Sequence, residues 1–159
     1  MSNVGKTFWA KRLTEVGFQH INCDDLIEAK LEPELKALGY SGLADISRWM
    51  GQPYDERFSK NQAKYLQLES QVMQEVLTSL KDSKQDKIVI DTTGSVIHTG
   101  EEICGLLQQL TTVLYLETPS NMKEEMFQKY VQHPKPVVFG SIYEPHNNET
   151  QTETLARCY

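Results

Sequence analysis

Arginine, cysteine and long apolar runs are all scarce in this chain. Only four arginines occur among the 159 residues, and the acidic residues outnumber Lys and Arg by 22 to 16, which gives a net charge of −6. A chain with this charge has no general attraction for nucleic acid or for anionic membranes. We therefore expect neither of these partners, and any phosphate that binds must be captured by local geometry.

The three cysteines Cys23, Cys104 and Cys158 lie far apart, without the spacing of a C-x-x-C motif. This pattern argues against a disulfide framework and against a zinc site, and it is typical of reduced thiols in the cytosol. No apolar run approaches the roughly 20 residues that a membrane-spanning helix needs. The first residues also lack the charged and then apolar order of a signal peptide. We therefore expect a cytoplasmic protein.

The length and composition suit one domain. A chain of 159 residues with 39% hydrophobic and 24% charged content is long enough to bury one sizeable core. We therefore expect a single domain over residues 1–159.

The first seven residues read M-S-N-V-G-K-T and run directly into an amphipathic segment. This is the phosphate-binding pattern G-x-x-x-x-G-K-[ST] without its opening Gly. In such a P-loop, backbone N–H groups wrap phosphate, the Lys neutralises it, and the Ser or Thr hydroxyl holds Mg²⁺. We expect Lys6 to bridge the phosphates and Thr7 to bind Mg²⁺; the alternative for Lys6 is a solvated lysine at a helix start. The residues expected around the nucleotide are Asn3, Val4, Gly5, Lys6, Thr7 and Phe8.

Three short apolar segments read as strands that alternate with helices, over residues 18–22, 87–91 and 112–116. This alternation predicts βαβ units, and so an α/β domain with a parallel sheet. The expected helices cover residues 7–16, 25–38 with a break or bend near Pro33, 43–50 behind a cap at Ser41, 55–80, 101–110, 120–132 and 152–159. A P-loop normally follows a strand and none precedes Met1, so we expect the first, central strand and the last strand of the sheet to be missing.

Acidic residues follow two of the expected strands. Asp24 and Asp25 come after the first, and Asp91 ends the strand I-V-I-D. Ligands of open α/β sheets bind at this edge, so Asp24 is a candidate to orient a substrate hydroxyl and Asp91 a candidate Mg²⁺ ligand of the Walker B type. The alternatives are ordinary helix-capping and turn-forming aspartates.

These residues together resemble the shikimate kinase family, small P-loop kinases that transfer the γ-phosphoryl of ATP to a hydroxyl of a cyclic acid. The family loop reads G-x-x-G-x-G-K-[ST]; residues 3–7 fill its last five places, with Asn3 in place of a Gly. The stretch N-C-D-D-L-I-E at 22–28 resembles the family's D-x-D-x-x-I-E, so Asp24 matches the acid that contacts substrate hydroxyls. The resemblance spans essentially the whole chain and implies a three-layer kinase fold, ATP and Mg²⁺.

The resemblance extends to the acceptor side with substitutions. Residues 92–96 resemble the family's G-G-G-x-V turn, which implies that Thr93 and Gly94 contact the substrate. Leu66 replaces the Arg of the family's F-R-x-x-E segment, and Leu cannot imitate a bidentate Arg–carboxylate contact, which argues against shikimate itself. The segment L-A-R near the end resembles the one that carries a second substrate-binding Arg, which implies that role for Arg157.

The family's R-P-L-L segment is represented by K-P-V-V, which implies a nucleotide contact for Lys135 in a lid over about residues 120–140.

The leading hypothesis is therefore ATP-dependent phosphoryl transfer to a hydroxyl of a small-molecule acceptor. One alternative is a catalytically impaired, nucleotide-binding regulatory module of the same fold, because Asn22, Leu66 and the Thr92-Thr93 pair depart from the family. Another is a GTPase, because S-N-V-G-K-T and D-T-T-G are similar to GTP-binding signatures, although an N-K-x-D guanine reader is missing after 112–116.

Overall fold

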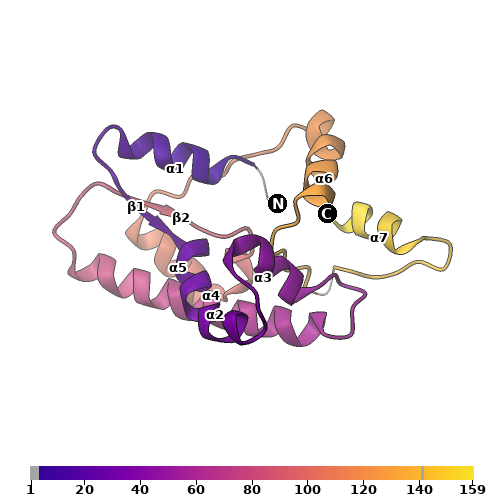
Figure 1. The fold of residues 1–159 in the computed structure, drawn as a ribbon. Coiled ribbons are helices and arrows are strands. Elements are labelled where there is room, and N and C mark those ends of the chain that lie inside the picture. Colours follow the sequence, from indigo (N-terminus) through magenta and orange to yellow (C-terminus); the bar gives the residue numbers. More distant parts are fainter. Residues whose placement is uncertain (1–3, 141) are drawn as a thin grey trace.

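A computed structural model of the chain describes residues 4–140 and 142–159. The protein is mixed α/β, with helices packed around a small parallel sheet (Figure 1). The elements in chain order are α1 (Lys6–Thr14), β1 (Gln19–Asn22), α2 (Cys23–Ala37), α3 (Gly42–Met50), α4 (Phe58–Asp82), β2 (Ile88–Asp91), η1 (Val96–His98), α5 (Glu101–Leu110), η2 (Ser120–Met122), α6 (Lys123–Gln132) and α7 (Gln151–Cys158).

The two strands β1 and β2 run parallel and side by side (Figure 1), with Gln19 opposite Ile88 and Asn22 opposite Asp91. This register brings the carboxyl ends of both strands to the same edge of the sheet. The chain continues there into α2 after β1 and into the Thr92–Ser95 turn after β2. The parallel pairing that the alternating pattern predicts is confirmed for these two strands.

The hydrophobic core lies where α4 packs against α2, α3 and α5. The apolar residues of α4 recur at helical spacing. Val72 and Met73 are fully buried, and they belong to the same hydrophobic cluster as Ile27 of α2 and Ile46 of α3. Burying each side chain of this size contributes about 1.5–3 kcal/mol. The thiol of Cys23, at the start of α2, is also buried and lies 3.7 Å from the sulfur of Met73.

Helix α2 differs from the prediction at its start and at its proline. Asn22 is the N-cap residue, and its side chain accepts a hydrogen bond of 3.1 Å from the backbone N–H of Asp24, so the two aspartates follow the cap. The helix also continues through Pro33 and does not break there. Pro33 removes one backbone hydrogen bond, but Leu31 and Leu35 on either side are both buried in the core and hold the two halves together.

The strand predicted over residues 112–116 is not formed. Val113, Leu114 and Tyr115 are 60%, 77% and 85% exposed, and the segment has no strand partner in the part of the chain that the structure describes. Strand propensity produces a strand only when a neighbour supplies backbone hydrogen bonds and a packing surface. The T-V-L-Y-L sequence has the composition of a strand, but neither condition is met.

The region after this segment contains η2, α6 and a loop that returns to the core. Gln62 of α4 accepts hydrogen bonds from the backbone N–H groups of Phe139, at 2.7 Å, and Gly140, at 3.1 Å. Phe139 is itself buried, so these contacts anchor the end of the predicted 120–140 lid to α4. None of the helices in the described ranges combines the length and apolar character that crossing a bilayer requires.

Candidate functional site

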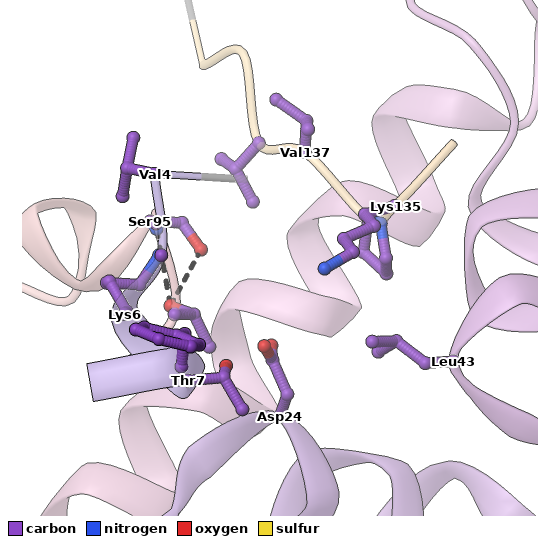
Figure 2. Close-up of a pocket in the computed structure, with 14 residues that line it drawn as sticks. Val4, Lys6, Thr7, Asp24, Leu43, Ser95, Lys135 and Val137 are labelled. Carbon is purple, nitrogen blue, oxygen red and sulfur yellow. Dashed lines mark hydrogen bonds between the residues drawn. The ribbon is translucent and has the colours of Figure 1, made fainter. Parts of the chain in front are cut away.

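A cavity of about 290 Å³ lies at the carboxyl edge of the sheet (Figure 2). Its walls come from the start of α1, the first turn of α2, the start of α3, the turn after β2 and the loop after α6. The lining residues are Val4, Gly5, Lys6, Thr7, Phe8, Asp24, Leu43, Thr93, Gly94, Ser95, Lys135, Pro136, Val137 and Val138.

The start of α1 has the properties of an anion site. Gly5 is the N-cap residue with φ of 93°, a left-handed conformation that favours glycine because it has no Cβ. The backbone N–H groups of a first helical turn have no partner within the helix, and the helix dipole adds positive charge at the same place. The first turn holds no acidic residue, and Lys6 and Thr7 both line the cavity.

Asp24 supplies a carboxylate to this cavity from the first turn of α2 (Figure 2). The hydroxyl of Tyr65, on α4, donates a hydrogen bond of 3.3 Å to its Oδ1. Burial raises the pKa of Asp24 above its usual value and nearby Asp91 adds to the rise, while Lys6, the Tyr65 hydroxyl and Lys135 oppose it. A carboxylate with a raised pKa holds a proton more readily than an exposed one, which suits proton transfer.

A buried network below the cavity was not predicted from the sequence. The carboxylate of Glu69, on α4, is fully buried and accepts hydrogen bonds from the hydroxyls of Thr93 and, at 2.6 Å, Ser95. Burial raises the pKa of Glu69, and the two hydroxyl hydrogen bonds oppose the rise. The sequence carried one signal, because Glu69 occupies the place of the Glu in the F-R-x-x-E segment that residues 65–69 resemble. The network fixes the turn that presents Gly94 to the cavity.

Of the two predicted Mg²⁺ ligands, Thr7 lines the cavity and Asp91 does not. Asp91 is 4% exposed, and its Oδ2 lies 3.5 Å from Nε2 of His20 on the neighbouring strand. The described residues contain no cluster of three His, Cys, Asp or Glu side chains arranged to hold a metal ion. Mg²⁺ that accompanies a nucleotide takes most of its oxygens from phosphates and water. Of the two predicted ligands, the Thr7 hydroxyl is therefore the one whose position in the cavity fits such an ion.

Arg157 lies outside the cavity, in contrast to the role that the family resemblance implies for it. Its Nε and Nη2 donate to the two carboxylate oxygens of Glu149 at 2.8 and 2.9 Å, and Nη2 also donates to the backbone carbonyl of Glu144 at 2.6 Å. The guanidinium therefore fastens α7 to the preceding loop. Arg48, Arg57 and Leu66 do not line the cavity either, so Lys6 and Lys135 supply its cationic side chains.

Most of the predicted site residues therefore converge on one cavity, from segments far apart in the sequence. Asp91 and Arg157 lie elsewhere, and Asn3 lies outside the described residues. The residues that converge are Val4, Gly5, Lys6, Thr7, Phe8, Asp24, Thr93, Gly94 and Lys135. Sequence reasoning did not assign Leu43, Ser95 or the apolar side chains of 136–138 to the site.

Comparison with protein-family models, with curated proteins and with solved structures finds no match to this chain.

Proposed function

We propose that this protein is a small-molecule kinase of the P-loop type, which transfers the γ-phosphoryl group of ATP to a hydroxyl group of its acceptor. The observation that carries the proposal is the meeting of G-K-T at a helix start, Asp24 and Lys135 around one cavity. Phosphoryl transfer depends on positioning and on charge neutralisation, and these groups supply both.

The phosphate side of the proposed site consists of the α1 N-terminus and two lysines. The free N–H groups of the first helical turn bind phosphate oxygens, and Lys6 and Lys135 neutralise their charge. The Thr7 hydroxyl would hold Mg²⁺, which would supply further neutralisation of phosphate charge. Residues 120–140 form the lid that excludes water.

The acceptor side consists of Asp24 and an apolar wall. Asp24 orients the acceptor hydroxyl and takes its proton as the hydroxyl oxygen bonds to the γ-phosphorus and the bond to the ADP oxygen breaks. Leu43 and Val137 contact the carbon skeleton of the acceptor. Because no described arginine lines the cavity, and both lysines face phosphate in this arrangement, the acceptor is a neutral hydroxyl compound rather than a carboxylate.

A coupled ADP-release assay tests the proposal. The full chain is supplied with ATP, Mg²⁺ and a panel of polyols and cyclic hydroxy acids that includes shikimate. We expect turnover with a neutral member of the panel, and we expect Lys6→Ala to abolish it. Lys11→Ala is the matched control, since Lys11 is exposed on the same helix and does not line the cavity. ATP binding without turnover on any hydroxyl acceptor would overturn the kinase proposal.

That negative outcome would favour the second candidate, a nucleotide-binding regulatory module. Two observations support it: the Thr93 hydroxyl is held by Glu69, and Asp91 faces His20 instead of the cavity. Isothermal titration and the ADP-release assay together separate the two candidates. Both candidates bind ATP and lose binding in Lys6→Ala, but the regulatory module releases no ADP. A preference for GTP over ATP in the same titration would instead favour a GTPase.

A further inference from the structure

We propose that Ser95 selects the acceptor, and that Glu69 sets this selection by holding the hydrogen of the Ser95 hydroxyl. The acceptor is then a polyol that places a second hydroxyl, besides the one that is phosphorylated, against Ser95. This inference rests on the proposed function of the cavity and adds the class of acceptor to it. Ser95 lines the cavity next to Gly94 (Figure 2), and we call its hydroxyl and the space before it the Ser95 subsite.

The hydrogens of the Thr93 and Ser95 hydroxyls are both committed to Glu69. A hydroxyl has one hydrogen to donate and two lone pairs that accept, whereas a charged carboxylate can only accept. Thr93 and Ser95 donate to different oxygens of Glu69, and Ser95 does so at 2.6 Å. The two hydroxyl oxygens lie 3.2 Å apart, but neither has a second hydrogen for the other. Neither hydroxyl therefore has a hydrogen left to donate to a ligand.

The two hydroxyls differ in the lone pairs that they have left. The Thr93 oxygen accepts a hydrogen bond of 3.2 Å from the backbone N–H of Ser95, and one of the dashed lines in Figure 2 marks this bond. The contacts of the Ser95 oxygen with described residues are the bond that it donates to Glu69 and the approach to Thr93, which has no hydrogen for it. Ser95 thus presents an acceptor, and no donor, to the cavity.

Burial makes this arrangement persistent. Glu69 is 0% exposed and Ser95 is 7% exposed, so water does not compete for the hydrogen bond between them. A hydrogen bond in such surroundings is electrostatically stronger than one in water. A ligand that needed a donor from Ser95 would have to break this bond and leave the buried carboxylate short of a partner, which is costly. The Ser95 subsite therefore accepts hydroxyl hydrogens and disfavours ether, carbonyl and carboxylate oxygens.

The cavity holds a second acceptor, Asp24, which is supported from the same side of α4. The Tyr65 hydroxyl donates to Asp24, and Glu69 accepts from Ser95. Tyr65 and Glu69 are four residues apart on the helix, so their side chains are neighbours on one face. In the proposed reaction Asp24 receives the hydroxyl that is phosphorylated, and Ser95 receives the hydrogen of another. A compound with a single hydroxyl satisfies one of these two acceptors, and a polyol satisfies both.

Binding of matched probes tests the proposal. The probes are the three isomeric cyclohexanediols. Each is compared with its monomethyl ether, which keeps the second oxygen without its hydrogen, and with cyclohexanol, which lacks both. Ligand-observed NMR measures their dissociation constants on the full chain without nucleotide. We expect at least one diol to bind about tenfold more tightly than its ether and than cyclohexanol. Equal affinities, or no binding by any probe, would overturn the proposal.

Two variants of the protein test the roles of the two residues. Ser95→Ala removes the acceptor, so a diol and its ether should bind with equal affinity. Glu69→Gln puts an amide donor in place of one carboxylate oxygen, which frees one hydroxyl hydrogen and should narrow the preference for the diol. Ser70→Ala is the matched control, because Ser70 lies on α4, donates to the backbone carbonyl of Leu66 and does not line the cavity. A preference that stays at the wild-type level in Ser95→Ala or Glu69→Gln contradicts the proposal.

The preference is a ratio of two affinities for the same protein, so a general loss of folded protein would weaken both probes alike and leave the ratio unchanged. The test is also independent of ATP. A diol preference without phosphoryl transfer would refute the kinase proposal and leave the Ser95 subsite in place. Phosphoryl transfer to a diol and to its monomethyl ether with equal kcat/KM would overturn the Ser95 subsite alone.

Discussion

Ser95 donates a hydrogen bond of 2.6 Å from Oγ to Oε2 of Glu69, and this contact ties the turn after β2 to the buried face of α4. Thr93 donates to the other oxygen of the same carboxylate. A single side chain on the longest helix thus determines the position of the turn that presents Gly94 to the cavity. The stability of the core and the geometry of the site are therefore linked through Glu69.

Removal of the Glu69 carboxylate takes away the acceptor that two buried hydroxyls share and leaves them only the 3.2 Å contact with each other. We expect Glu69→Ala to lower the free energy of unfolding by about 2–4 kcal/mol, because each unsatisfied buried group costs about 1–3 kcal/mol. Urea denaturation measures the change. The matched control is Gln67→Ala, an exposed position on the same helix, with an expected effect within about 0.5 kcal/mol. Equal effects of the two substitutions would show that the network contributes no stability.

The raised pKa of Glu69 makes stability depend on pH with a definite sign. In the folded protein the pKa of Glu69 lies above its ordinary value of 4.5. Between these two pKa values the native state therefore holds more protons than the unfolded state. The free energy of unfolding therefore falls as pH rises from about 4.5 through the raised pKa. Glu69→Gln removes this titration, so we expect its stability relative to wild type to improve over the same interval. Urea denaturation across that pH range measures the free energy of unfolding of both proteins. If the two free energies changed with pH in parallel, the prediction would be contradicted.

The Tyr65 hydroxyl affects the pKa of Asp24, whose carboxylate we propose as the proton acceptor. This hydroxyl stabilises the charged form of Asp24, so Tyr65→Phe should raise the Asp24 pKa further. The acidic limb of the pH–rate profile should then move to higher pH, and an NMR titration of the Asp24 carboxyl carbon should show the same direction. Tyr130→Phe is the control, because the Tyr130 hydroxyl contacts Gln52 and does not line the cavity. An unchanged Asp24 titration in Tyr65→Phe would exclude this role.

Arg157 should affect stability and leave substrate binding unchanged. Arg157→Ala removes the bidentate contact with Glu149, so amide exchange in residues 144–158 should become faster and Tm should fall. We expect Arg157→Lys to restore the exchange rate and the Tm only in part, because an ammonium group lacks the planar two-donor geometry. The KM values for ATP and for the acceptor should stay at the wild-type level. A raised KM with unchanged exchange would instead place Arg157 at the substrate.

The elements that the sequence predicted well are those with a strong local signal. The apolar periodicity of residues 101–110 predicts α5 from end to end, and the I-V-I-D run predicts β2. The G-K-T sequence before an amphipathic segment also predicts the α1 start that lines the cavity. These features depend on neighbours in the sequence, so a single sequence contains enough information to find them.

The predictions that failed depend on partners distant in the sequence. Residues 112–116 have strand composition, but the strand needs a neighbour that the described chain does not place beside it. The family resemblance implies a substrate contact for Arg157, and Glu149 holds the guanidinium elsewhere. The sequence also does not show that Thr93 and Ser95, 24 and 26 residues further along the chain, donate to Glu69. Spacing alone does not reveal which distant residue completes such a contact.

The rate of chemical modification at Cys23 reports how often the core around it opens. Burial raises the pKa of its thiol from 9.0 to about 12, and its sulfur lies against Met73 at the contact between α2 and α4. The thiolate is the form that reacts with alkylating reagents, so this cysteine is inert while the two helices remain packed. Each modification event at Cys23 therefore records a moment when α2 has separated from α4. Its rate reports the opening of the helix that carries Asp24 without any added probe in the core.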